Sequence, residues 1–200
     1  MKIGLYGGTF SPPHAAHVRA AKLFIKEAYL DRLIVMPAGI PPHKVADKWG
    51  KSETRLEMTC LAFSDFACVS DYEIKKEGRS YTVETLKHLK EIYPQDELYM
   101  LVGEDMFLSL ETWREPEVIM GMCTVVALRR KGTENAVMEE AAERYRKLYG
   151  ATVLLMEDEP FEMSSTEIRN KIAAGEDMQE YLIPEVAEYI KKNNLYKNDK

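Results

Sequence analysis

Short apolar runs alternate along the chain with amphipathic stretches in which apolar residues recur at helical spacing. Short apolar runs between turn signals are typical of buried strands, whereas longer amphipathic stretches predict helices. The predicted strands are residues 3–6, 32–37, 67–74, 98–102, 124–128 and 152–156. The predicted helices are residues 15–29, 53–63, 82–92, 134–149 and 183–193.

This alternation predicts an α/β fold with a doubly wound parallel sheet, because a crossover helix returns the chain to the same end of the sheet. Ligands of such sheets bind outside the carboxyl ends of the strands. One domain is expected over residues 1–200, with a C-terminal helical part from about residue 164 to 200. We therefore expect the residues that follow Tyr6, Pro37, Val102 and Met156 to converge on one site.

Composition and charge narrow the class of protein without naming a function. The 200 residues are 46% hydrophobic and 30% charged, which is typical of a globular domain. A net charge of −6 argues against a general affinity for nucleic-acid backbones, although a local basic pocket is compatible with it. No apolar run reaches membrane-spanning length. We expect no nucleic-acid or membrane partner, and a homo-oligomer stays open.

The cysteines and the N-terminus indicate a cytoplasmic protein. Cys60, Cys68 and Cys123 are an odd number, lack metal-ligand spacing and have apolar neighbours, so buried reduced thiols are expected. The apolar stretch at residues 3–6 is too short for a signal peptide.

Residues 7–17, GGTFSPPHAAH, directly follow the first predicted strand. Paired glycines let backbone approach a ligand, and the exposed N–H groups of the helix that starts near the histidines favour an anion. His14 and His17 are three residues apart, so on a helix both rings face the same side. A phosphate chain is the ligand that this string favours.

Two structural alternatives apply to this segment. The Gly7-Gly8 pair would also serve a plain strand-to-helix turn. The histidines would also serve as surface residues or as metal ligands. A metal site needs further ligands at fitting spacing, and the other histidines, His43 and His88, lie in different contexts.

Two further segments follow predicted strands and carry cations. Residues 37–44, PAGIPPHK, place Lys44 on a proline-rich loop, where it would cap a triphosphate, grip an acceptor phosphate or simply be solvated. Residues 163–169, MSSTEIR, contain Ser164 with Glu167 three residues later, which is a capping box and needs no function. Arg169 on the following helix would offer bidentate contacts to phosphate oxygens.

The third region comprises residues 80–86, SYTVETL, and residues 101–113, which run from LVGEDMF to Trp113. Each part has a structural alternative. Thr82 and Thr85 would cap a helix, Asp105 would open one, and Trp113 would belong to the core.

These segments together resemble the nicotinate-nucleotide adenylyltransferases of the nucleotidyltransferase superfamily. Residues 7–17 are similar to the signature GGTFDPxHxGH, with Ser11 in place of Asp and Ala16 in place of Gly. Residues 37–44 resemble the loop PxxxPPHK, residues 163–169 the motif ISSTxIR, and residues 80–113 the SYTxxT and GxD…W segments. Arg114 follows the tryptophan where the family often has an aromatic residue, and Arg55 also matches a family segment, although a helix-stabilising role explains it equally well.

The resemblance implies a Rossmann-like nucleotidyltransferase fold and transfer of the adenylyl group of ATP to nicotinate mononucleotide, with Mg²⁺ bound to ATP and no metal held by the protein alone. Catalysis would fall to His14, His17, Lys44 and Arg169. ATP would contact Gly7, Gly8, Thr9, Phe10, His14, His17, Gly103, Asp105, Ser165, Thr166 and Arg169. The acceptor would contact Lys44, Thr85, Asp105 and Trp113.

Two rival functions stay open. One is a sister nucleotidyltransferase that uses nicotinamide mononucleotide or phosphopantetheine, because the histidine and Ser-Ser-Thr elements are shared across the superfamily. The other is a noncatalytic nucleotide-binding module, which the retained His14, His17, Lys44 and Arg169 disfavour.

Overall fold

A computed structural model describes residues 1–39, 51–76, 78–130, 136–158 and 163–197. Six parallel strands form one sheet in the order β3-β2-β1-β4-β5-β6. This order confirms the doubly wound parallel sheet. The strands are β1 (Lys2–Gly8), β2 (Arg32–Pro37), β3 (Cys68–Val69), β4 (Glu97–Gly103), β5 (Thr124–Arg130) and β6 (Val153–Asp158).

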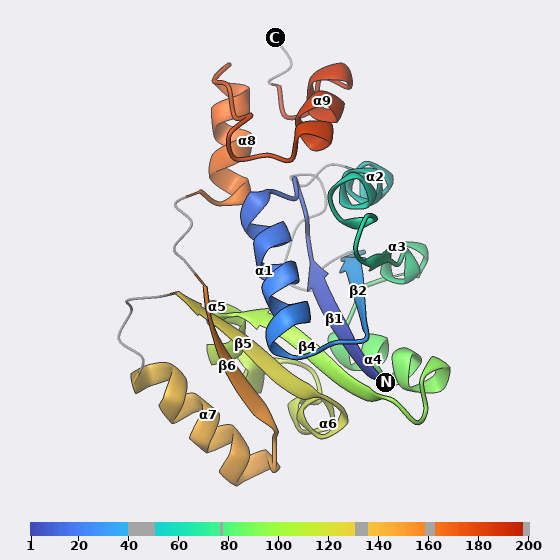
Figure 1. Ribbon diagram of the computed structural model, residues 1–200, viewed down its shortest axis with the longest axis vertical. Helices are drawn as coiled ribbons and strands as arrows, with labels where there is room; N and C mark the ends of the chain where they lie inside the picture. The colour runs from blue at the N-terminus through green and yellow to red at the C-terminus, as the bar shows by residue number, and fades with distance from the viewer. Residues whose placement is uncertain (40–50, 77, 131–135, 159–162, 198–200) are drawn as a thin grey trace.

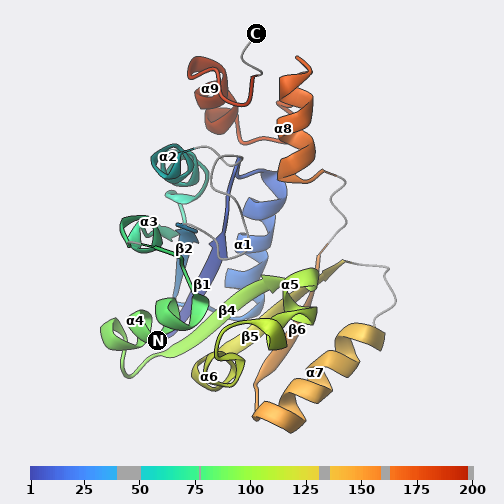
Figure 2. The ribbon, with the colours of Figure 1, turned by 180° about the vertical axis from the view of Figure 1, so that it is seen from behind.

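Helices cover both faces of the sheet (Figures 1 and 2). They are α1 (Ala15–Glu27), α2 (Ser52–Phe63), α3 (Tyr72–Lys75), α4 (Thr82–Ile92), α5 (Glu104–Leu108), the short 3₁₀ helix η2 (Leu110–Thr112), α6 (Pro116–Met122), α7 (Ala136–Tyr149), α8 (Ser165–Ala173) and α9 (Pro184–Lys192). In the part of the chain that the structure describes, no helix is both long and apolar enough to cross a membrane.

Alternate residues of each strand feed two apolar cores. In β4, Met100 packs with α4, α5, α6 and α7 on one face of the sheet. Its neighbour Leu101 packs with α1, α2, α8 and α9 on the other face. Continuous apolar strands are expected where both faces of a parallel sheet are covered. Helices α8 and α9 lie above the carboxyl end of β1, where they close over the site end of the molecule (Figure 1).

The strand register sets the position of the site. Tyr6 of β1 pairs with Val35 of β2 and with Leu101 of β4, so the carboxyl ends of these three strands lie side by side at one end of the sheet. The N–H of Ala38 donates to the carbonyl oxygen of Gly8 across 2.8 Å, which continues this pairing past the strand ends. The direction of winding reverses between β1 and β4, and such a point is where doubly wound sheets bind ligands.

Two sequence predictions are wrong in this region. The strand predicted over residues 67–74 is only Cys68–Val69, and helix α3 follows at Tyr72–Lys75. Pairing with β2 ends after Val35, because the strand lies at the edge of the sheet and has one neighbour. Cys60 and Cys68 are exposed rather than buried, and only Cys123 of the predicted buried thiols is enclosed. All three are free thiols.

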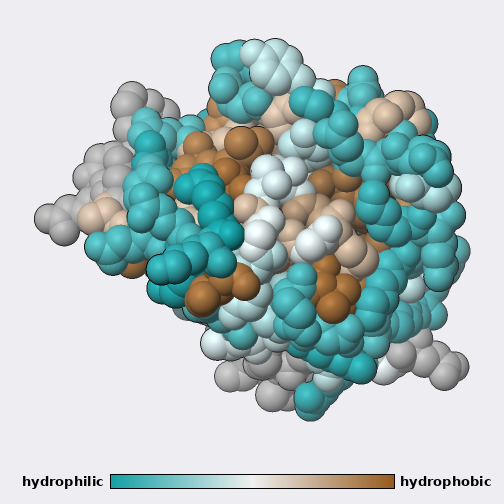
Figure 3. All heavy atoms as spheres, turned by 90° about the horizontal axis from the view of Figure 1, so that it is seen from below, coloured by the Kyte–Doolittle hydropathy of each residue, from teal (hydrophilic) through white to brown (hydrophobic). Residues whose placement is uncertain are grey.

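At the opposite end of the molecule, apolar and hydrophilic residues are interspersed on the surface. Figure 3 views the molecule from the side remote from α8 and α9, and apolar patches there are bordered by hydrophilic residues. Scattered apolar residues such as Tyr29 and Leu148 are normal on protein surfaces. The question of a homo-oligomer therefore stays open.

Candidate active site

The turn after β1 is shaped by the ring of Phe10. A Cβ on Gly8 would come within 2.8 Å of this ring, whereas a Cβ on Gly7 would meet no atom of the described residues within 4 Å. Phe10 has a φ of 48° and is 2% exposed, so burial of its ring holds a backbone conformation that side chains rarely adopt. Packing explains Gly8, and open space beside Gly7 fits the predicted approach of a ligand.

The two histidines of the turn lie against each other. Their ring centroids are 3.8 Å apart with an interplanar angle of 32°. His14 is the N-cap of α1, and its backbone N–H donates to Nδ1 of His17 across 3.2 Å. The helix start therefore brings both imidazoles together, as their spacing predicted.

This hydrogen bond and burial fix the protonation of the pair. Because Nδ1 of His17 accepts a hydrogen bond, the proton of the neutral ring belongs on Nε2. Burial lowers the pKa of His14 to about 4. Burial, and then the proximity of His14, hold the pKa of His17 well below its ordinary value. At neutral pH the turn thus carries two uncharged imidazoles, and Nε2–H of His17 is a hydrogen-bond donor.

Helix α8 docks on the same turn from the far end of the chain. The hydroxyl of Ser165 donates to the carbonyl oxygen of Pro12 across 3.0 Å. Nη1 of Arg169 donates to the carbonyl oxygen of Ser11 across 2.7 Å, and its Nη2 donates to Oγ1 of Thr166 across 3.1 Å. Residues 163–169 therefore pack against residues 7–17, with the guanidinium of Arg169 beside the glycine turn.

The capping box of this motif is also present. The N–H of Glu167 donates to Oγ of Ser164 across 3.2 Å, and the N–H of Ser164 donates to Oε2 of Glu167 across 2.7 Å. The structural alternative and the site role are thus compatible, because the cap uses Ser164 and Glu167 while Ser165 and Arg169 face the turn.

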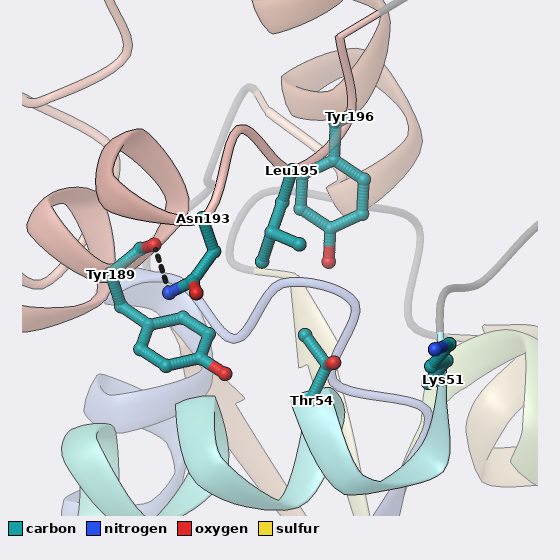
Figure 4. Close-up of a pocket in the computed structure, with 6 residues that line it drawn as sticks. All are labelled: Lys51, Thr54, Tyr189, Asn193, Leu195 and Tyr196. Carbon is teal, nitrogen blue, oxygen red and sulfur yellow. Dashed lines mark hydrogen bonds between the residues drawn. The ribbon is translucent and has the colours of Figure 1, made fainter.

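Ser11, which departs from the family signature, connects the turn to the C-terminal segment. Its hydroxyl lies 3.1 Å from the phenol oxygen of Tyr196, and its side chain is buried. Figure 4 shows Tyr196 on one wall of a pocket of about 360 Å³ between the start of α2 and the end of α9. Its lining is Lys51, Thr54, Tyr189, Asn193, Leu195 and Tyr196. The pocket therefore adjoins the turn, and none of the described residues predicted to bind ATP or the acceptor lines it.

The predicted acceptor residues lie around the carboxyl end of β4. Gly103 is the N-cap of α5, and Asp105 in its first turn is exposed. Trp113 is half-buried and packs against the core beneath α4, α5, α6 and α7. Thr85 is 2% exposed, and its hydroxyl donates to Oε1 of Glu73 across 2.7 Å. Trp113 therefore contacts the core, as its structural alternative predicts. The hydroxyl of Thr85 is hydrogen-bonded to Glu73 of the same chain.

Arg114 occupies the position where the family often has an aromatic residue. Its guanidinium lies 4.7 Å from the ring centroid of Tyr81, and its Nη1 donates to Oε1 of Glu84 across 3.1 Å. The contact with Tyr81 is of the cation–π type. This edge of the site is half-exposed.

Arg55 has a stronger role than the sequence indicated. It is 3% exposed, its Nη1 donates to the carbonyl oxygen of Thr9, and its Nη2 donates to that of Gly39, each across 3.0 Å. Arg55 therefore contacts two segments outside its helix, which the helix-stabilising alternative does not explain. The spacing of the buried positions Arg55, Met58, Thr59, Ala62 and Phe63 was the available signal, because it puts the arginine on the apolar stripe.

Lys44 lies outside the described residues, as does the rest of the PPHK segment. Within the described ranges, no three His, Cys, Asp or Glu residues group closely enough to hold a metal ion. The predicted roles of Lys44 and of Mg²⁺ are taken up below as proposals.

The fold and the paired histidines define a nucleotidyltransferase of the α/β class, and the chain belongs to the cytidylyltransferase-like family, which matches residues 5–171. It is 39% identical to a probable nicotinate-nucleotide adenylyltransferase of Thermoanaerobacter sp. (strain X514), over 100% of this chain and 96% of the relative. It is 37% identical to a probable nicotinate-nucleotide adenylyltransferase of Clostridium botulinum (strain Kyoto / Type A2), over 96% of this chain and 98% of the relative.

Solved structures share the fold. A nicotinic acid mononucleotide adenylyltransferase of Plasmodium falciparum complexed with NaAD superposes with a TM-score of 0.79 at 19% identity, over 98% of this chain and 97% of that chain. A putative nicotinate-nucleotide adenylyltransferase of Vibrio parahaemolyticus has a TM-score of 0.69 at 20% identity, over 99% and 96% of the two chains. These likenesses confirm the predicted fold class.

Proposed function

We propose that this protein transfers the adenylyl group of ATP to nicotinate mononucleotide, giving nicotinate adenine dinucleotide and pyrophosphate in NAD biosynthesis. Full-length relatives at 39% and 37% identity that carry the name of this activity support the assignment. The observation that carries it is the pair of stacked imidazoles, His14 and His17, on a turn to which Arg169 is hydrogen-bonded.

The glycine turn and α8 would hold the triphosphate. Backbone groups of Gly7, Gly8, Thr9 and Phe10, together with Gly103, Asp105, Ser165 and Thr166, are the proposed ATP contacts. His17 would contact the α-phosphate, and His14 the bridging or β-phosphate. Arg169, whose pKa burial lowers but which stays a cation, would hold charge at the pyrophosphate end.

The chemistry requires positioning and charge stabilisation. A phosphate oxygen of the acceptor attacks the α-phosphorus of ATP in line, the α–β bridging P–O bond breaks, and pyrophosphate leaves with that electron pair. Because this nucleophile is already ionised near neutral pH, no general base is needed. Neutral imidazoles suit the task, since Nε2–H of His17 donates a hydrogen bond to developing negative charge.

The acceptor would bind beyond the end of β4. Trp113 would stack on the pyridine ring, Asp105 would contact a ribose hydroxyl, and the start of α4 near Thr85 would meet the carboxylate. Lys44 would bind a phosphate at the edge of the second strand. These four assignments rest on the motif resemblance, and the exposure of Asp105 and half-burial of Trp113 are compatible with them.

Mg²⁺ is proposed to enter with ATP rather than from a protein site. The cited side chains around the turn are imidazoles, a hydroxyl and a guanidinium, and none of them is a carboxylate, through which proteins usually bind Mg²⁺. Bound to phosphate oxygens, the ion would offset charge on the leaving pyrophosphate. The protein groups then supply orientation and hydrogen bonds.

Pyrophosphate release tests the proposal. The protein is incubated with ATP and Mg²⁺ and with nicotinate mononucleotide, nicotinamide mononucleotide or phosphopantetheine in parallel. We expect the highest kcat/KM with nicotinate mononucleotide. Turnover of phosphopantetheine alone would overturn the acceptor assignment, and nucleotide binding without pyrophosphate from any acceptor would indicate a noncatalytic module.

A further inference from the structure

A partly buried polar junction joins four segments beside the turn. It consists of Arg55, Gly39, Glu73 and Thr85, from α2, the end of β2, α3 and α4. Arg55 donates from Nη1 to the carbonyl oxygen of Thr9 and from Nη2 to that of Gly39. One guanidinium therefore ties the segment after β1 to the segment after β2.

Gly39 is enclosed on its other side by Glu73. A Cβ at residue 39 would collide with the backbone carbonyl oxygen of Glu73 and would lie 2.8 Å from Oγ of Ser80. Backbone contact this close tolerates glycine alone. Gly39 is also the last described residue before the segment that contains Lys44.

The carboxylate of Glu73 continues the junction to α4. It accepts a hydrogen bond of 2.7 Å from Oγ1 of Thr85, which lies one turn into that helix. Burial raises the pKa of Glu73, while hydrogen bonds from the Thr85 hydroxyl and from the N–H of Gly39 act in the opposite direction. Glu73 is partly buried, and a carboxylate held partly out of water is costly unless polar partners surround it, as Thr85 does here.

We propose that Glu73 is a positioning residue for the acceptor, holding Gly39 and the start of α4 in register with the turn that Arg55 holds at Thr9. This inference rests on the proposed function, because it concerns the geometry between the two substrates. Glu73 acts through Thr85 and Gly39 and touches neither substrate. Arg55 ties both substrate segments, whereas Glu73 serves the acceptor segment.

Because Glu73 holds only the acceptor segment, its loss should change the KM for the acceptor and not the KM for ATP. Loss of the Glu73 carboxylate removes the acceptor for the Thr85 hydroxyl and for the N–H of Gly39 but leaves both Arg55 bonds, to Thr9 and to Gly39, in place. The KM for nicotinate mononucleotide should then rise about ten-fold, the scale of a lost hydrogen bond to a charged group. The KM for ATP should stay within about two-fold.

Steady-state pyrophosphate release with each substrate varied in turn tests this. Glu73→Ala and Gly39→Ala should both raise the acceptor KM, the second because its Cβ collides with Glu73. Glu73→Gln keeps an oxygen for the Thr85 hydroxyl and should recover part of the loss. Thr85→Val, which removes the hydroxyl that donates to Glu73, should resemble Glu73→Ala.

Two matched substitutions control for composition and folding. Glu91→Ala removes a carboxylate from the exposed side of α4, and Gly121→Ala adds a methyl group that meets nothing within 4 Å. Both should leave each KM unchanged. If Glu73→Ala fails to fold, Glu73→Gln and Gly39→Ala supply the measurement.

The outcomes separate the two proposals. A native protein that releases no pyrophosphate with nicotinate mononucleotide overturns the proposed function and this inference with it. An active native protein whose Glu73 and Gly39 variants lose thermal stability yet keep the native acceptor KM overturns the positioning role alone. An equal rise in both KM values also overturns it, because the effect would then not be confined to the acceptor.

Discussion

The turn after β1 and the segments after β4 lie at the same edge of the sheet, but protein contacts restrain them differently. In the turn, the carbonyl oxygens of Thr9, Ser11 and Pro12 each accept a hydrogen bond from a side chain of α2 or α8. After β4, Asp105 is exposed and Trp113 is half-buried. The turn proposed to bind ATP is thus held by distant parts of the chain, whereas Asp105 and Trp113, proposed to bind the acceptor, lie on or beside short local helices.

This difference matches what each substrate demands. A triphosphate that reacts at its α-phosphorus needs donors fixed in advance, because preorganised donors need no rearrangement as charge develops. An aromatic ring and a ribose are recognised by stacking and a few polar contacts, which tolerate a more exposed wall. Substitutions on the ATP side should therefore lower kcat, and those on the acceptor side should raise one KM.

The largest effect is expected for His17→Ala. Removal of a donor aimed at developing charge typically costs about 10² to 10³ in rate, so kcat should fall by this factor while the fold is retained. Steady-state pyrophosphate release and thermal unfolding measure the two quantities. His88→Ala, which removes an imidazole stacked on Tyr72 instead, is the control. A near-native kcat for His17→Ala would remove the imidazole from the reaction.

Acid should lower the free energy of unfolding, because the buried imidazoles stay uncharged only in the folded state. His14 is 6% exposed and its pKa is about 4, against 6.5 in an unfolded chain. Between these values the unfolded state binds more protons, so stability is fully present above pH 6.5 and falls as pH drops toward 4. This residue alone contributes about 3 kcal/mol to that fall.

The measurement is the free energy of unfolding against pH, from urea denaturation. His14→Gln should be less sensitive between pH 6.5 and 4 than the native protein. Carboxylates titrate in both proteins, so the difference between the curves is the readout. Parallel curves for native and His14→Gln would contradict burial of a neutral imidazole at this position.

Local signals in the sequence predicted the sheet and the ATP side. Apolar runs located all six strands, and α4 has its predicted bounds of Thr82–Ile92. The histidine spacing predicted two rings on one face, and the structure has them 3.8 Å apart. The prediction over residues 67–74 was wrong because alternation of apolar residues does not reveal where pairing with β2 ends.

Long-range contacts between polar side chains could not be predicted from the sequence. Nothing near Glu73 in the chain indicates that its carboxylate accepts a hydrogen bond from the hydroxyl of Thr85, twelve residues later in another helix. Likewise, Ser11 and Tyr196 are separated by 185 positions. Such pairs depend on how helices pack on the sheet, and periodicity predicts which side of a helix is buried, not which polar group it meets.

A smaller effect, confined to one substrate, is expected for Trp113→Ala. Loss of a stacked ring is worth about 0.5 to 1.5 kcal/mol beyond buried area, so the KM for nicotinate mononucleotide should rise several-fold. The KM for ATP should not change. Trp113→Phe keeps an aromatic face and should recover most of the affinity. An unchanged acceptor KM in the alanine variant would assign Trp113 to the core alone, where it already packs.

The smallest effect is expected for Tyr196→Phe, which tests how far the C-terminal segment supports the turn. The substitution removes the phenol oxygen 3.1 Å from Oγ of Ser11 and leaves the ring in place. A hydrogen bond between neutral groups contributes about 1 kcal/mol, so thermal stability should fall modestly and the KM for ATP should rise less than three-fold, or about 0.65 kcal/mol. Tyr189→Phe, which loses an exposed contact to Glu57, should leave the KM for ATP at its native value. Equal KM values for both variants would mean that Arg169, not Tyr196, is what holds Ser11 in place for ATP.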